Sequence, residues 1–193
     1  MMKGIDVSHN NGIVNWASVK NAGFEFVMIR VGYGKNTLDR QFYNNVNGAL
    51  KYGFKIGIYH YSYALTVDDA KKEADFIVKT LKQCGLTPKR LIGVYCDMED
   101  ADGYKARHGM PTRQTITNIC SVAVNTFWRA GYTAGIYANN DWLRNKIDLS
   151  QLGGCALWLA EPGKSRPSRK CTIWQYTFTE KINGKTFDGD ILM

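Results

Sequence analysis

Residues 55–97 contain the stretch that decides the fold: the apolar run KIGIYHY at Lys55–Tyr61, the amphipathic stretch VDDAKKEADFIVKTLKQC at Val67–Cys84, and a second apolar run, IGVYCD, at Ile92–Asp97. Short apolar runs bounded by polar residues predict buried strands. The stretch between them is typical of a helix, because Thr66 can cap its start, two aspartates occupy its first turn and a glycine follows its end. This order predicts two parallel strands joined by a right-handed crossover.

The same alternation continues on both sides of this segment. The further strand-like runs are Gly4–Val7, Phe26–Val31, Thr133–Ala138, Cys155–Ala160, Cys171–Tyr176 and Phe187–Leu192, and the further helical stretches are Trp16–Asn21, Arg40–Tyr52 and Thr112–Ala130. In Arg40–Tyr52 we expect Phe42, Val46, Ala49 and Leu50 to form the buried face. Eight strands that alternate with helices favour a closed, TIM-like α/β barrel.

The length of the chain indicates that this barrel is irregular. A regular (β/α)₈ barrel typically needs about 250 residues, whereas the chain has 193. The gaps from Ala160 to Cys171 and from Tyr176 to Phe187 are too short for a comfortable helical crossover of a dozen or more residues. We therefore expect one domain, residues 1–193, whose last three strands close the barrel through loops or antiparallel pairing.

Composition and charge exclude several classes of protein. No apolar stretch approaches the roughly 20 residues that span a bilayer, so we expect no membrane insertion, and the start of the chain lacks the apolar core of a secretory signal. Five scattered cysteines predict buried, reduced thiols. The net charge of +8 comes without a nucleic-acid recognition motif, so it indicates either solubility or attraction to a polyanionic substrate or surface.

Two carboxylates, Asp97 and Glu99, stand one residue apart at the end of a predicted strand. Residues i and i+2 of a strand point to the same side, so both would face one pocket. Converging buried acids tend to separate their pKa values, which provides one acid and one base. The alternative is that both residues cap a turn in solvent.

Acids, amides and large aromatic residues recur at the other predicted strand ends, where active sites of parallel α/β sheets lie. Aromatic rings stack on sugar rings, carboxylates and amides bind hydroxyl groups, and two carboxyls suffice for glycoside hydrolysis. Among the tryptophans we expect core packing for Trp16, Trp128 and Trp142, and we expect His60 to donate or accept a hydrogen bond in the pocket. The histidines and cysteines lack metal-ligand spacing, so we expect no metal and no cofactor. The candidate site residues are Asp6, Arg30, Tyr59, Tyr61, Asp97, Glu99, Tyr137, Trp158, Trp174, Gln175 and Asp188.

The chain resembles glycoside hydrolase family 25, the Chalaropsis-type lysozymes that are common among bacteriophage endolysins and bacterial autolysins. The segments that carry the resemblance occur in order over nearly the whole chain. They are Gly4–Ser8, Phe26–Gly34, Asp39-x-x-Phe42-x-x-Asn45, Gly57–Tyr61, Asp97–Glu99, Gly135–Tyr137, Leu157–Ala160, Trp174–Tyr176 and Asp188.

The resemblance implies a barrel of five β/α units and three final strands, (β/α)₅(β)₃. It also implies hydrolysis of the β-1,4 bond between N-acetylmuramic acid and N-acetylglucosamine in bacterial peptidoglycan. Glu99 matches the family's proton donor. Asp97 is its partner, which either sets the pKa of Glu99 or steers the N-acetyl group of the substrate as an internal nucleophile. Asp6 and Asp188 match acids that line the same pocket.

The chain departs from the family pattern at two places. Asn11 stands where the family often has glutamine, and Asp190 stands where an asparagine is common, with no role that the sequence assigns. Two other functions are weighed against hydrolysis: a catalytically silent module that binds cell-wall glycan, and a zinc amidase or peptidase. The lack of a secretory signal suits an endolysin stored in the host cytoplasm before it reaches the wall, and family members often carry a wall-binding domain after a position equivalent to residue 193.

Overall fold

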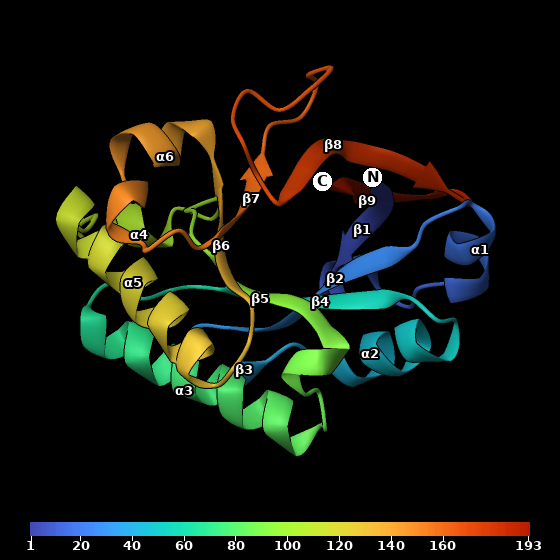
Figure 1. Ribbon diagram of the computed structural model, residues 1–193, viewed down its shortest axis with the longest axis horizontal. Helices are drawn as coiled ribbons and strands as arrows, with labels where there is room; N and C mark the ends of the chain where they lie inside the picture. Colours follow the sequence, from blue (N-terminus) through green and yellow to red (C-terminus); the bar gives the residue numbers. More distant parts are fainter.

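Eight strands of the computed structural model, which describes residues 1–193, close into a barrel (Figure 1). Going round the barrel, β1 pairs with β2, followed by β4, β5, β6, β7, β8 and β9, and β9 returns to β1. All neighbouring pairs are parallel except the two that β9 makes, with β8 and with β1. The strands are β1 (Met2–Val7), β2 (Phe26–Tyr33), β4 (Lys55–Tyr61), β5 (Leu91–Asp97), β6 (Ala134–Asn139), β7 (Ala156–Ala160), β8 (Ile173–Ile182) and β9 (Lys185–Leu192).

Helices cover the outside of the barrel after its first five strands only, which confirms the irregular TIM-like fold. The two longest, α3 and α5, pack side by side (Figure 1). No helix follows β7 or β8. The crossover helices are α1 (Trp16–Asn21), α2 (Phe42–Lys51), α3 (Val67–Gln83), α5 (Arg113–Arg129) and α6 (Asn140–Asn145), and the short α4 (Tyr104–Arg107) lies between β5 and α5.

The strands alternate between two cores. Along β2, Val27 and Ile29 face the helices, whereas Phe26 and Met28 face the inside of the barrel. The inside is filled at its base by aromatic rings, with Trp158 at the centre. Its ring meets those of Tyr59, Tyr95 and Tyr137 edge to face, with centroids 5.5, 6.0 and 4.7 Å away. This aromatic layer forms a floor, above which polar side chains can gather.

Gly135 of β6 makes room for this aromatic layer. A Cβ atom added to Gly135 of β6 would lie 2.4 Å from the backbone oxygen of Ala156 and 2.5 Å from the ring of Tyr95. Such distances are shorter than van der Waals contact, so only glycine fits beside Tyr95 at this point of the barrel.

Several local expectations need correction. Leu50 and Trp128 are 45% and 38% exposed, so neither belongs to the buried face of its helix, whereas Trp16 and Trp142 are buried as predicted. The two-residue strand β3 (Thr37–Leu38), α4 and α6 were not predicted. No helix is long and apolar enough to cross a membrane.

Candidate active site

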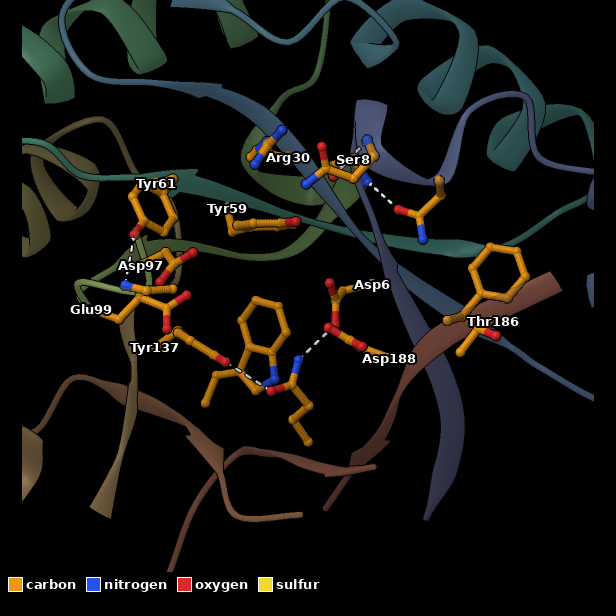
Figure 2. A pocket seen from close by; sticks show the side chains of 16 residues that line it. Asp6, Ser8, Arg30, Tyr59, Tyr61, Asp97, Glu99, Tyr137, Thr186 and Asp188 are labelled. Carbon is orange, nitrogen blue, oxygen red and sulfur yellow. Dashed lines mark hydrogen bonds between the residues drawn. The ribbon is translucent and has the colours of Figure 1, made fainter. Parts of the chain in front are cut away.

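A cavity of about 350 Å³ opens at the carboxyl ends of the parallel strands, above the aromatic floor (Figure 2). Ten of the eleven predicted site residues line it, and Trp174 does not. Figure 2 shows Asp97 and Glu99 on one side and Asp6 and Asp188 on the other. The lining residues are Asp6, Ser8, Asn10, Asn11, Arg30, Tyr59, Tyr61, Asp97, Glu99, Ala101, Tyr137, Trp158, Gln175, Thr186, Phe187 and Asp188.

Strand alternation brings Asp97 and Glu99 to the same side of the chain. Asp97 is the last residue of β5, and the buried side chain of Met98 packs in the outer core between the barrel and the helices. The backbone N–H of Met98 donates to the carbonyl of Tyr137 at 2.9 Å, so the extended backbone continues past the end of the strand. Both carboxyls therefore point into the cavity, and Asp97, which is 4% exposed, does not cap a turn in solvent.

Antiparallel pairing places the other two acids. Because β9 runs against its neighbours, its first half lies at the carboxyl ends of the parallel strands, and Asp188 is paired with Asp6 of β1. Gln175 of β8 donates from Nε2 to a carboxylate oxygen of Asp6 at 2.8 Å and accepts from the hydroxyl of Tyr137 at 2.8 Å. This chain of hydrogen bonds fixes the orientation of the Asp6 carboxyl.

Burial favours the protonated forms of all four acids. Burial raises the pKa of Asp6 well above its usual value, and the charge of Asp188 adds to this. Burial and the charge of Glu99 act in the same way on the pKa of Asp97. The pKa of Glu99 is raised by burial, although the positive charge of Lys105 offsets part of the effect. Burial raises the pKa of Asp188 to about 6. Each of these acids therefore keeps its proton to a higher pH than a free carboxyl does, which is the direction that a general acid requires.

Asp190 lies beneath this cluster and is wholly buried inside the barrel. It accepts a hydrogen bond of 2.8 Å from the indole nitrogen of Trp158. Burial, with the neighbouring charge of Asp6, raises the pKa of Asp190 well above its usual value. Its place in the structure is thus to hold the central tryptophan of the floor, a contact that the sequence alone did not indicate.

Arg30 is held in place by a buried carboxylate behind the cavity wall. Asp39 accepts hydrogen bonds from Nε of Arg30 at 2.8 Å and from the backbone N–H groups of His9 and Gln41 at 3.1 and 2.9 Å. Burial by itself would raise the pKa of Asp39, but these hydrogen bonds outweigh it and hold the pKa below its usual value. Arg30 also lines a second hollow of about 470 Å³, which adjoins the cavity at Asn10, Arg30, Tyr61 and Ala101.

Two predicted pocket residues point away from the cavity, because neighbours on a strand face opposite sides. On β8, Gln175 faces the cavity, and the indole nitrogen of Trp174 donates instead to the backbone oxygen of Glu161 at 3.0 Å. On β4, Tyr59 and Tyr61 face the cavity, so the expectation that His60 forms a hydrogen bond there is wrong. His60 is buried beside Glu73 without a hydrogen-bond partner, and burial lowers its pKa to about 3.

The sequence did not single out Ser8, Ala101, Thr186 and Phe187 as pocket residues. Thr186 and Phe187 line the cavity because β8 and β9 form a hairpin whose turn is Asn183–Gly184. An Asn-Gly pair between two strand-like runs is a strong hairpin signal, and it was available in the sequence. No group of three or more histidine, cysteine, aspartate or glutamate side chains is arranged to hold a metal ion.

The acids of this cavity are arranged so that one buried carboxyl can give up a proton while other carboxyls lie across the cavity from it. Tyrosine hydroxyls, the Gln175 amide and the Arg30 guanidinium supply hydrogen-bonding groups around the acids. This combination suits the cleavage of a glycosidic bond, where one acid protonates the leaving oxygen and a second carboxylate acts at the sugar.

Comparison with known proteins yields one family. The model of the glycosyl hydrolases family 25 matches residues 5–185. Lysozyme M1 of Streptomyces globisporus is 30% identical over 197 residues, which cover 98% of this chain and 66% of that protein. An autolytic lysozyme of Clostridium acetobutylicum is 27% identical over 192 residues, which cover 98% and 55%. The chain thus spans just under two thirds of the first relative and about half of the second.

A solved structure agrees with the fold. The crystal structure of the CTP1L endolysin superposes with a TM-score of 0.82 at 22% identity, over 100% of this chain and 67% of that one. The likeness extends over the whole barrel, including its final strands without helices. The match of the family model to nearly the full length shows that the chain belongs to glycosyl hydrolases family 25.

Proposed function

We propose that this protein is a muramidase that hydrolyses the β-1,4 bond between N-acetylmuramic acid and N-acetylglucosamine in bacterial peptidoglycan. The observation that carries the proposal is the meeting of Glu99, Asp97, Asp6 and Asp188 in one cavity, with the pKa of each raised by burial. Membership of the family and the names of its lysozyme relatives agree with this chemistry.

Glu99 is the proposed general acid. It is less deeply buried than Asp97, so its carboxyl can reach a bound sugar, and burial raises its pKa in the direction that favours the protonated form. The proton of Glu99 passes to the glycosidic oxygen while the bond from this oxygen to the anomeric carbon of N-acetylmuramic acid breaks. Water then bonds to the anomeric carbon and displaces the group that had bonded to it; one proton of the water returns to the Glu99 carboxylate, and the other stays on the new hydroxyl.

The remaining carboxyls stabilise the positive charge that develops on the sugar. Asp97 is the proposed partner of Glu99, which either tunes its proton affinity or orients the N-acetyl group as an internal nucleophile. Asp6 and Asp188 stand across the cavity, and either a carboxylate or that N-acetyl group makes the first bond to the anomeric carbon. Arg30, Tyr59, Tyr61, Tyr137 and Gln175 are the proposed contacts to the sugar, and Trp158 supports them from below.

Replacing Glu99 tests the proposal. We expect Glu99→Gln to fold normally and to lose at least about 100-fold in the release of reducing sugar ends from purified peptidoglycan, because the amide cannot donate an acidic proton. Glu25→Gln, which changes an exposed glutamate immediately before β2, is the matched control and should keep full activity.

The products distinguish the alternatives. New reducing ends support a muramidase, new amino groups indicate an amidase or peptidase, and binding without any product indicates a silent glycan-binding module. If Glu99→Gln kept more than a few per cent of wild-type activity, Glu99 would not be the general acid.

The setting of the reaction also belongs to the proposal. We propose that the protein is held in the host cytoplasm before it reaches the cell wall, and a solved structure that resembles it is named an endolysin. The longer relatives are consistent with a separate wall-binding domain in a full-length protein.

A further inference from the structure

Lys105, on α4, is the only lysine whose side chain is wholly buried. It lies behind the segment that carries Glu99, and its ammonium donates to the backbone carbonyl of Glu99 at 2.9 Å. The same ammonium donates to the backbone carbonyl of Ser62, immediately after β4. Lys105 therefore ties the backbone of the proposed acid to the end of a neighbouring barrel strand.

The local sequence folds so as to place this lysine. Asp100 accepts hydrogen bonds from the backbone N–H groups of Lys105 and Ala106 at 2.7 and 2.9 Å. The chain after Glu99 thereby turns back on itself, and the side chain of Lys105 is directed toward the backbone carbonyls of Glu99 and Ser62. This tight turn depends on the Asp100 side chain, because its carboxylate accepts hydrogen bonds from backbone N–H groups that would otherwise lack partners.

The charge of Lys105 is not balanced by a direct ion pair. None of the ion pairs in the protein includes it. Its nitrogen lies 5.8 Å from the ring centre of Tyr61 and 5.9 Å from that of Trp142, and cation–π attraction to these rings offsets part of its desolvation. A buried ammonium with only two carbonyl partners is expensive compared with a methionine of similar size. A role in packing alone does not account for a charge at this position.

We propose, on the basis of the proposed function, that Lys105 is a positioning residue of the active site: its buried ammonium fastens the Glu99 backbone and supplies the positive charge that the carboxyl cluster faces from below.

The electrostatic surroundings support this role. Lys105 lowers the pKa of Glu99, against burial and against Asp188 of β9 and Asp102 and Asp100 of the adjoining loop, all of which raise it. It also lowers the pKa of Asp97, against burial, Glu99 and Asp6 of β1, and there Arg30 of β2 acts in the same direction. On α3, it lowers the pKa of Glu73. Lys105 is thus the cation with the largest effect on the pKa of Glu99.

An electrostatic role of Lys105 predicts a change in the pH profile, whereas a role limited to its backbone hydrogen bonds does not. Removing the charge of Lys105 raises the pKa of both Glu99 and Asp97. Glu99 must be protonated to act, so the loss of activity at high pH moves to higher pH, and the low-pH limb, which depends on an ionised carboxyl, moves the same way. For Lys105→Met we expect both limbs of the kcat/KM profile to shift upward by about one pH unit.

Two variants serve as controls. Lys105→Arg keeps the charge, and if it folds its profile should stay at the wild-type position. Lys79→Met removes an exposed charge from α3 and should leave both the rate and the profile unchanged. If Lys105→Met folded and lost activity equally at every pH, with the limbs unmoved, the proposal would be overturned in favour of a structural tie.

A measurement on the wild-type protein covers the case in which Lys105→Met does not fold. The ¹³Cε and ¹⁵Nζ resonances of Lys105 report whether its amine is charged over the pH range of activity. A charged amine supports the proposal, and a neutral one refutes it. If the wild-type protein released no reducing ends, the proposed function would fail instead, and a ¹³C titration of the Glu99 carboxyl in wild type and Lys105→Met would still decide whether the two charges are coupled.

Discussion

At the scale of single residues, the four acids proposed for catalysis lower the stability of the folded protein at neutral pH, because burial raises their pKa values. A carboxyl whose pKa is higher in the folded protein than in the unfolded chain binds protons more tightly when folded. The stability it contributes is present at low pH and is lost as the pH rises through the folded pKa. All four acids of the cavity have a raised pKa in the folded protein, so each makes the protein less stable as the pH rises.

Asp188 gives the most direct test of this pH dependence of stability. Its pKa is about 6 in the folded protein and about 3.9 in an unfolded chain, so the free energy of unfolding should fall as the pH rises from about 4 to about 6. Asp188→Asn carries no charge. It should be more stable than the wild type at pH 7 by about 1 kcal/mol, allowing for partial solvent screening, and no more stable at pH 4.

Urea denaturation of both proteins at the two pH values measures this difference. An equal stability difference at pH 4 and pH 7 would contradict the assigned ionisation of Asp188. The substitution should at the same time impair hydrolysis, which separates its effect on stability from its effect on the reaction.

Single residues also show how far sequence patterns reach. The spacing of Asp97 and Glu99 was sufficient to predict that both face one cavity, because the period of a strand is two. The same period did not reveal the phase of two other strands. In Tyr59-His60-Tyr61 the two outer residues face the cavity, whereas in Trp174-Gln175-Tyr176 the middle residue does. The phase of a strand buried on both faces depends on the packing of its neighbours, and all of these residues are apolar or amphipathic enough for either side.

At the scale of elements, α3 is fastened to the end of β4 by one buried carboxylate. Glu73 accepts hydrogen bonds from the hydroxyl of Ser62 at 2.6 Å and from the backbone N–H of Tyr63 at 2.9 Å. Burial raises its pKa to about 7. The segment it holds leads from β4, which carries Tyr59 and Tyr61 into the cavity, to the helix that covers the barrel.

Removing Glu73 should therefore destabilise the protein. We expect Glu73→Ala to lower the free energy of unfolding by about 2 kcal/mol, because it leaves a buried hydroxyl and a backbone N–H without partners. Asp75→Ala, at an exposed position of the same helix, should change it by less than about 0.5 kcal/mol. Chemical denaturation measures both variants, and equal effects would show that the Glu73 hydrogen bonds do not hold this connection.

The elements that the sequence predicted are those with a strong local pattern. Every barrel strand and the helices α1, α2, α3 and α5 were predicted, because each carries an apolar run or a helical period of its own. The short α4 has no such pattern and depends on hydrogen bonds to the Asp100 side chain. The two-residue β3 forms only because it lies beside the end of β2. Structure that arises from contacts outside the element is not visible in its own residues.

At the scale of the whole molecule, the excess of positive charge bears on the encounter with the substrate. The net charge is +8, and a bacterial wall is a polyanion if the proposed substrate is correct. Long-range attraction of this kind accelerates association and is screened by salt.

We therefore expect the rate of wall lysis to fall by about tenfold or more when NaCl is raised from about 0.05 M to about 0.5 M. Hydrolysis of a short, uncharged glycan fragment should change much less, because chemistry inside the cavity is shielded from the bulk ions. A turbidity assay on purified walls and a reducing-end assay on the fragment make the comparison. Equal salt dependence of the two substrates would exclude steering by the net charge.

The closure of the barrel by β9 has a consequence for the synthesis of the enzyme. Asp188 follows Glu99, the preceding acid of the cavity, by 89 residues (from 99 to 188), so a ribosome that adds about 5–20 residues per second reaches it roughly five to twenty seconds later. Until β9 inserts between β8 and β1, the nascent protein has neither its fourth acid nor a complete wall around the other three. On the proposed function, copies that stop before β9 lack a complete cavity and should be inert, so they would not expose the cell that makes them to hydrolysis.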